Sequence, residues 1–178
     1  MDTHPFGTEH DITEKGYEYA HHSIKVKKVP LAEARIKVGG PQCTKPYNAS
    51  IMNISAMSYG ALSRNAVRAL NLGAKLANIY QNTGEGGLTP HHLANGGDIT
   101  WQIGTGYFGC RSKNGGFDPE LFTKNAKLEN VKMIEIKISQ GAKPSHGGVL
   151  PADKITDEIA TIRGIPTGQD CLSPPDHQ

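Results

Sequence analysis

From residue 51 onward, short apolar segments alternate with glycine-rich loops and helical patterns. Strand candidates span 51–57, 79–80, 99–103 and 131–137. Ser63 is a suitable N-cap for a helix that reaches Ala77, and the spacing of Val67, Leu70 and Ala74 places them on one face. This alternation is typical of a parallel sheet, either doubly wound or a (β/α)8 barrel. We therefore predict an α/β protein whose functional loops follow the carboxyl ends of the strands.

Two further helices are predicted downstream, and little regular structure upstream. One helix lies within residues 115–127. The second begins at an Asp153 cap, carries Ile155, Ile159 and Ile162 on one face, and ends at Gly164. The polar start of the chain, with its proline and glycine breaks, is expected to be irregular, with one short helix near 32–36. The predicted division is an N-terminal arm over 1–48 and an α/β domain over 49–178.

Composition and charge exclude several classes of protein. The chain has 19 Lys and Arg against 17 Asp and Glu, a net charge of +2, which gives no electrostatic reason to expect a nucleic acid or an anionic membrane as partner. No apolar run approaches the roughly 18 residues of a membrane span, and the N-terminus lacks a signal-peptide pattern. Cys43, Cys110 and Cys171 are too widely spaced for a disulfide scaffold or a paired metal motif. We expect a cytoplasmic protein without a metal site.

Three local motifs are given structural interpretations. Residues 104–109 (GTGYFG) match G-x-G-x-x-G, but the polar, glycine-containing segment that follows cannot begin the helix that a dinucleotide site requires. The adjacent His91 and His92 are expected to lie in a loop rather than to bind a metal. Cys110 has no histidine base nearby in the sequence, so a buried structural thiol is expected.

Two polar groups follow predicted strands. Residues 82–87 (NTGEGG) place an amide, a hydroxyl and a carboxylate among glycines, as a site or as a turn that needs positive φ. Lys137 closes an apolar strand, with Gln140 and Lys143 on the loop beyond it. Two cations at one strand end suit an anionic cofactor ring or a carboxylate substrate; the alternative is a pair of solvated lysines.

Taken together, these segments resemble the FMN-binding synthase domain of glutamate synthase, in particular its shorter relatives. The resemblance rests on six blocks in the order of the family: 55–63, 82–87, Gln102 with 106–109, 136–144, 147–151 and 173–177. Six ordered blocks are far more specific than any single motif. The family fold is an FMN-type (β/α)8 barrel, and the four predicted βα units correspond to its N-terminal half.

The resemblance implies a reaction and a set of site residues. In the family, reduced FMN passes a hydride to 2-iminoglutarate, formed from 2-oxoglutarate and ammonia. Lys137 would stand near flavin N1 and O2, where negative charge develops on reduction, and Glu85 matches a loop glutamate that links the synthase site to the ammonia-producing site. The cofactor contacts implied are Ala56, Met57, Ser58, Tyr59, Gly60, Asn82, Gln102 and Lys137. The substrate carboxylates would meet Gln140, Lys143 and Arg163.

Departures from the family pattern leave alternatives open. Val149 stands where glutamate synthase has a substrate-contacting glutamine, and His146 also departs, which favours another amino-acid or imine substrate, as in an N-methylglutamate synthase-like enzyme. The glutaminase cysteine and the iron–sulfur cysteine cluster are not in this sequence. A barrel needs about 250 residues, so we expect a second chain or self-assembly to complete it, and FMN not to be retained by the half-barrel alone. A catalytically inert assembly module is the alternative.

Overall fold

The computed structural model describes residues 13–18, 21, 24–30, 32–140, 146–175 and 177. The chain divides into two compact units, Met1–Pro30 and Leu31–Gln178. No helix among the described residues is long and apolar enough to cross a membrane. The helices and strands of the second unit are, in chain order, β1 (Arg35–Val38), β2 (Tyr47–Ser50), α1 (Arg64–Ala77), β3 (Tyr80–Asn82), α2 (Pro90–Leu93), β4 (Asp98–Ile103), α3 (Pro119–Ala126), β5 (Val131–Ile136), β6 (Val149–Leu150), the 3₁₀ helix η2 (Ala152–Lys154), α4 (Asp157–Arg163) and β7 (Cys171–Leu172).

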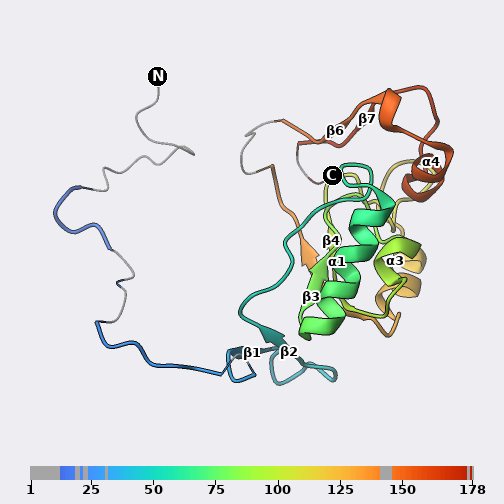
Figure 1. Ribbon diagram of the computed structural model, residues 1–178. Helices are drawn as coiled ribbons and strands as arrows, with labels where there is room; N and C mark the ends of the chain where they lie inside the picture. Colours follow the sequence, from blue (N-terminus) through green and yellow to red (C-terminus); the bar gives the residue numbers. More distant parts are fainter. Residues whose placement is uncertain are drawn as a thin grey trace. The chain divides into compact units, whose positions relative to one another are not determined.

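A three-stranded parallel sheet organises this unit. Its strands follow chain order, β3-β4-β5, with parallel pairing throughout. A parallel bridge between Ile54 and Gln81 adds the preceding segment beside β3. Two antiparallel strand pairs accompany the sheet: the hairpin β1-β2, and β6-β7, whose strands are separated in the chain by η2 and α4. The predicted α/β class with a parallel sheet is therefore confirmed (Figure 1).

The helices that connect the parallel strands pack on one face of the sheet. Gln81 on β3 donates from Nε2 to the carbonyl of Val67 on α1, at 3.2 Å. Trp101 on β4 is fully buried and stacks on Phe122 of α3, with ring centroids 5.8 Å apart. Since side chains alternate along a strand, Gln81 and Trp101 mark the same face, because Gln81 pairs with Ile99, two residues before Trp101. A doubly wound sheet, in contrast to this arrangement of α1 and α3, carries helices on both of its faces.

The opposite face of the sheet is polar. Asn82, Thr100 and Gln102 point to this side from β3 and β4, and all three are buried. Glu135 on β5 pairs in register with Gln102 and joins them. The carboxyl ends of the strands therefore present amide, hydroxyl and carboxylate groups on the face that α1 and α3 do not cover.

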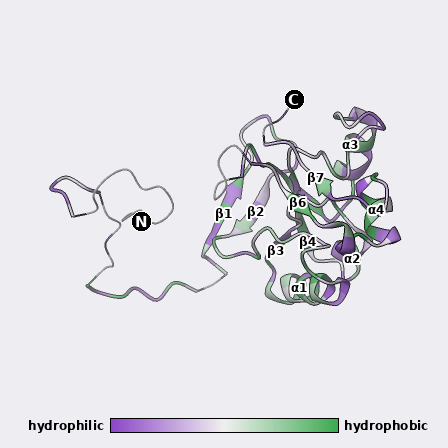
Figure 2. Cartoon of the chain, turned by 90° about the horizontal axis from the view of Figure 1, so that it is seen from above, coloured by the Kyte–Doolittle hydropathy of each residue, from purple (hydrophilic) through white to green (hydrophobic). Residues whose placement is uncertain are grey.

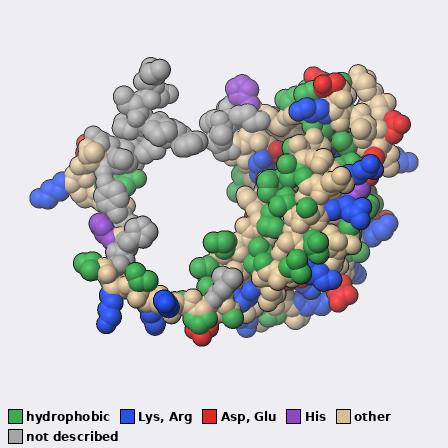
Figure 3. Space-filling view, in the orientation of Figure 1, with side chains coloured by type: hydrophobic (Ala, Val, Ile, Leu, Met, Phe, Trp, Pro, Cys, Tyr) green, Lys and Arg blue, Asp and Glu red, His purple; other side chains and the backbone are tan. Residues whose placement is uncertain are grey.

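The longest helix, α1, begins and ends where its local sequence directs it. The hydroxyl of Ser63 accepts from the Ala66 N–H at 3.3 Å, which confirms the predicted N-cap. Asn78 ends the helix in the left-handed region, at φ 52°. Val67 and Ala74 are fully buried, and the mixed hydropathy of α1 in Figure 2 reflects this one-sided burial. Leu76 is 79% exposed, and Figure 3 shows apolar side chains on the surface where α1 lies.

Replacing Gly73 by alanine is expected to stabilise the protein by about 1 kcal/mol. Gly73 lies inside α1, is exposed, and a Cβ there would meet nothing within 4 Å. Alanine lowers the conformational entropy that an internal helical glycine loses on folding. Urea unfolding of the G73A protein should show a higher midpoint with an unchanged slope. A lower midpoint would contradict the placement of Gly73 on an open helix surface.

The start of the second unit differs from the prediction. The helix expected near 32–36 is wrong: β1 occupies this region and pairs antiparallel with β2, Val38 opposite Tyr47. Alternating β-branched residues and the break at Gly39, where φ is 115°, favour a short strand over a helix that would have too few residues to propagate. The hairpin spans the predicted boundary between the arm and the α/β domain, and that boundary stays a prediction.

Three other expectations about the chain's elements can be checked. The strand expected over 51–57 contracts to the bridge at Ile54, because the Asn53 side chain accepts the Tyr80 N–H at 3.2 Å and takes the place of a backbone partner. The helix expected to begin at Asp153 begins instead after Thr156, whose hydroxyl accepts from the Ile159 N–H, while Asp153 lies in η2. As predicted, no helix follows residues 104–109 directly, since α3 begins only at Pro119.

His91 and His92 lie on the short helix α2, and not in a loop as expected. His92 completes a capping box with Thr89: its Nδ1 is 3.3 Å from the Thr89 N–H nitrogen and 2.8 Å from the Thr89 hydroxyl. The side chain is fully buried, and its Nε2 has no hydrogen-bond partner among the described residues. This burial, with the neighbouring His91, lowers the pKa of His92 to about 4.

The protein is expected to lose about 2 kcal/mol of stability through His92 between pH 7 and pH 5. The pKa of His92 in the folded state lies below its ordinary value of 6.5, so the unfolded state binds the proton first and stability falls as the pH drops below 6.5. Unfolding free energies of the wild type and of H92N, whose Oδ1 can replace Nδ1 as the cap acceptor, provide the measurement. Equal pH dependence in both proteins would contradict the burial of a neutral imidazole.

Candidate functional site

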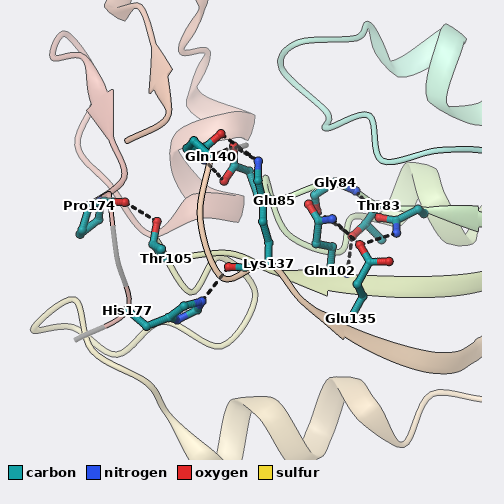
Figure 4. A network of polar contacts seen from close by, with 11 residues as sticks. Thr83, Gly84, Glu85, Gln102, Thr105, Glu135, Lys137, Gln140, Pro174 and His177 are labelled. Atoms are coloured by element: carbon teal, nitrogen blue, oxygen red, sulfur yellow. Dashed lines mark hydrogen bonds and ion pairs between the residues drawn. The ribbon is translucent and has the colours of Figure 1, made fainter. Parts of the chain in front are cut away.

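Three polar side chains meet beyond the carboxyl ends of β3 and β5. The Lys137 ammonium lies 3.1 Å from Oε1 of Glu85 and donates to Oε1 of Gln140 at 2.9 Å. The Gln140 amide donates in turn to both oxygens of Glu85, at 3.0 and 2.7 Å. Figure 4 shows these three side chains converging from two segments, Glu85 from the loop after β3, and Lys137 and Gln140 from the stretch just after β5. We call this group the Lys137 cluster; it brings together one cation, one carboxylate and one amide that the sequence placed after two different strands.

Local backbone contacts fix where the members of the Lys137 cluster stand. The Lys137 N–H donates to the carbonyl of Ile103 at 2.9 Å and so continues the ladder between β4 and β5. The Glu85 side chain packs closely against the backbone of two glycines. A Cβ on Gly104 would lie 2.8 Å from the Glu85 Cβ, and one on Gly148 would lie 3.1 Å from its Oε1. Side chains at these two positions would occupy the space that the Glu85 side chain fills.

A second network lies on the polar face of the sheet. Oε1 of Glu135 accepts from Nδ2 of Asn82 at 3.0 Å and also from Nε2 of Gln102. The Asn82 Oδ1 accepts the Gly84 N–H at 2.9 Å, and the Thr83 hydroxyl accepts the Gln102 N–H at 3.0 Å (Figure 4). Both amides therefore have fixed orientations.

Glu135 is a residue that the sequence reasoning did not select. It lies within the strand candidate 131–137, and no role was assigned to it there. The signal that could have found it is its spacing of two from Lys137, because extended residues two apart point to the same side, so Glu135 faces as Lys137 does just beyond the end of β5. A pocket of about 270 Å³ opens beside Glu135, Asn82 and Ala56.

The segment predicted to line the flavin, residues 56–60, packs directly on the glycine-rich loop after β3. A Cβ on Gly84 would lie 2.6 Å from the Ser58 backbone nitrogen and 2.9 Å from the Met57 carbonyl carbon. Ala56 is exposed, while Met57 and Ser58 are partly buried. The loop after the Ile54 bridge and the loop after β3 thus form one backbone surface. The two backbones can approach this closely because Gly84 has no side chain.

The Tyr59 phenol does not join this surface. Its hydroxyl donates to Oε2 of Glu158 on α4 at 2.5 Å, and its ring meets that of His91 edge-on at 4.9 Å. Burial, with the Glu158 carboxylate beside it, raises the pKa of Tyr59 to about 12. The hydrogen bonds from Tyr59 and His91 lower the pKa of Glu158. Tyr59 therefore contributes only its backbone to the surface formed by the two loops.

Two residues near the end of the chain, Pro174 and His177, contact the residues that follow β4 and β5. The Thr105 hydroxyl donates to the carbonyl of Pro174 at 2.5 Å. His177 Nε2 lies 2.8 Å from the Lys137 carbonyl oxygen (Figure 4). The centroid of its ring is 5.3 Å from that of the Tyr107 ring. His177, in a block for which the sequence analysis named no site residue, thus contacts the backbone of Lys137 itself.

The remaining predicted substrate residues have different surroundings. Arg163 is 7% exposed, donates from Nη2 to the carbonyl of Tyr59 at 3.1 Å, and lies 5.0 Å from the centre of the Phe108 ring. It joins α4 to the 56–60 segment, and its hydrogen bonds within the described part of the chain go to Tyr59 and Cys171, not to the Lys137 cluster. Lys143 lies outside the described residues. Burial raises the pKa of the Cys110 thiol to about 11, in keeping with a structural thiol.

Comparison with known proteins identifies the family of this strand-end arrangement. The conserved region of glutamate synthase matches residues 10–178, nearly the whole chain. The chain belongs to the glutamate synthase family. It is 40% identical over 177 residues to the glutamate synthase large subunit-like protein YerD of Bacillus subtilis, covering 98% of this chain and 33% of YerD. It is 36% identical over 161 residues to the archaeal glutamate synthase [NADPH] of Methanocaldococcus jannaschii, covering 90% and 28%.

The alignments cover most of this chain but only part of each relative. With the archaeal glutamate synthase [NADPH] of Archaeoglobus fulgidus, identity is 43% over 124 residues, 69% of this chain and 22% of that protein. The chain therefore spans between about a fifth and a third of these glutamate synthase relatives. The predicted family is confirmed, and the match includes every segment that forms the Lys137 cluster and the Glu135 network.

Proposed function

We propose that this chain forms the N-terminal half of an FMN-type (β/α)8 barrel. Two features of the sheet support a barrel over a doubly wound fold. Its strands follow chain order without reversal, and α1 and α3 both pack on the face marked by Gln81 and Trp101. In a barrel the helices form an outer ring and the functional groups gather at the carboxyl ends of the strands, where the Lys137 cluster lies.

The donors at the strand ends fit a flavin ring. Lys137 carries an ammonium with three hydrogens, two of which are directed at Glu85 and Gln140, so one more acceptor can be served. The backbone of 56–60 and the oriented amides of Asn82 and Gln102 supply neutral polar contacts. FMN bound there would supply hydride transfer. Lys137 would hold negative charge on the pyrimidine side of the ring, the role of a preorganised cation.

The reaction that we propose is the reduction of 2-iminoglutarate, formed from 2-oxoglutarate and ammonia, to glutamate. Gln140, Lys143 and Arg163 would hold the substrate carboxylates. The chain's own groups would then bind and orient the substrate while Lys137 and Glu85 act at the reacting end. The observation that carries this proposal is the convergence of Lys137, Glu85 and Gln140 beyond the carboxyl ends of β3 and β5, in a chain of the glutamate synthase family.

A flavin titration tests the proposal. We expect added FMN to bind the chain once self-assembly or a second chain has completed the barrel, with a shifted visible absorption band, and not to be retained by the half-barrel alone. Photoreduced and kept without oxygen, the bound flavin should be reoxidised only when 2-oxoglutarate and ammonium are both added. A protein that FMN does not saturate, or whose flavin is reoxidised equally by either compound alone, would contradict the proposed function.

A second candidate function, an assembly module that acts through its sheet edge, is favoured by exposed apolar residues there. Ile136 is 66% exposed and Ile138 is 75% exposed, on and just beyond β5, which is the last strand of the described sheet. An unpaired parallel edge with apolar side chains is a surface for pairing. Sedimentation over a range of concentrations should show association with a second copy. A monomer at all concentrations would contradict this candidate.

A further inference from the structure

The Lys137 cluster holds a carboxylate in the manner in which a binding site holds a carboxylate ligand. Oε1 of Glu85 meets both the Lys137 ammonium, at 3.1 Å, and the Gln140 amide, at 3.0 Å; Oε2 meets the same amide at 2.7 Å. A charged donor and a neutral donor thus share one carboxylate. The same donors would serve the carboxylate of a free ligand equally well.

We call the position at Lys137 and Gln140 that the Glu85 carboxylate occupies the carboxylate seat. There is room for a carboxylate in this seat because two neighbouring residues are glycines and have no side chains. Gly104 and Gly148 approach Glu85 from two different segments, and a Cβ on Gly104 would lie 2.9 Å from its Oε2. The seat is also reached from solvent, since the Glu85 side chain is 22% exposed and that of Lys137 is 27% exposed. Glu85 itself lies in a loop between glycines, which allows the side chain to leave without disturbing β3.

We propose that Glu85 is a resident carboxylate that fills the seat at Lys137 and Gln140, and that a carboxylate ligand binds only by displacing it. The inference deepens the proposed function, on which it rests for the identity of the ligand as the substrate acid. Besides its proposed role at the reacting end, Glu85 then acts as the competitor that the ligand carboxylate displaces from Lys137 and Gln140. The ligand would be a carboxylic acid whose carboxylate binds Lys137 and Gln140 more favourably than the Glu85 carboxylate does.

Displacement has a measurable consequence for affinity. The apparent dissociation constant of a ligand rises by the inverse of the fraction of protein whose seat is open. With Glu85 bound most of the time, removing it should strengthen carboxylate binding by about tenfold. Removing a nearby negative charge also reduces repulsion of an anion, so the experiment needs a variant that separates the two effects.

Glu85→Asp provides that separation. Aspartate keeps the charge but is one methylene shorter, so it cannot reach both donors as Glu85 does. Calorimetric titration with 2-oxoglutarate and with unreactive glutarate, without flavin, should give the order E85A tightest, then E85D, then wild type. Glu129→Ala, an exposed acid outside the cluster, is the matched control and should equal wild type. In the E85A background, K137M should abolish the gain.

The outcomes separate this inference from the proposed function. If E85A binds both acids no more tightly than wild type, or if no variant binds either acid, the resident-carboxylate role is wrong. If E85A gains affinity but E85D does not, repulsion explains the gain and displacement is wrong. If the predicted order holds while FMN fails to bind, the proposed oxidoreductase activity falls and the carboxylate seat stands.

Discussion

The G84A protein is expected to be less stable than the wild type by about 4 kcal/mol. Gly84 has φ 66°, and a Cβ there would lie 2.6 Å from the Ser58 nitrogen and 2.9 Å from the Met57 carbonyl carbon. A left-handed conformation costs a residue with a side chain about 1–2 kcal/mol, and overpacking costs about 1–3 kcal/mol more. The clash is with backbone, so a change of rotamer cannot relieve it. Urea unfolding should show a much lower midpoint.

Gly164→Ala is the matched control for this prediction. Gly164 ends α4 with nearly the same φ, 63°, but a Cβ there would meet nothing within 4 Å. It should cost only about 1 kcal/mol, the conformational part alone. Equal losses in the two variants would show that the loop after β3 does not pack on residues 57–58.

The elements of the α/β unit that the sequence predicts best are those specified locally. Ser63 caps α1 as expected, since its hydroxyl meets the third N–H of the helix regardless of distant contacts. Strand β5 spans Val131–Ile136 and was expected over 131–137, because an apolar run between a helix and a glycine-rich loop has few alternatives. These signals depend on neighbouring residues, so one sequence is enough to read them.

The elements that were predicted wrongly depend on distant partners. β1 exists because β2 pairs with it, Ile36 opposite Ala49, which no pattern within 32–36 could indicate. The strand expected over 51–57 is limited to Ile54 because the side chain of Asn53 competes for the backbone of Tyr80. Propensity is a weak guide where a tertiary contact decides.

The candidate site was anticipated in part. Lys137, Glu85 and Gln140 were selected from the sequence, and the structure brings them together, although their roles stay predictions. Glu135 was missed, because a single acid in a strand usually faces solvent, and only the register with Gln102 shows that it orients amides from two other strands. Strand register is a property of the sheet and is not written in any one strand.

Lys137→Met is expected to slow the proposed flavin-dependent reduction by at least about 100-fold. The ammonium would be lost from the point where negative charge develops, and the Glu85 carboxylate would lose its cation. The rate at which 2-oxoglutarate with ammonium reoxidises the reduced flavin gives the first readout, and FMN affinity gives a second that does not depend on turnover.

Lys132→Met separates the role of Lys137 from the general effect of losing a lysine near this strand. Lys132 lies on β5 itself, is about equally exposed at 33%, and makes only a 3.8 Å ion pair with Asp98. Exposed pairs of this kind contribute about 1 kcal/mol or less, so stability and rate should change little. If both variants slow the reaction alike, the charge of β5 as a whole matters and Lys137 has no special position. If only K137M slows it, the cation must act from the strand end where Glu85 and Gln140 hold it.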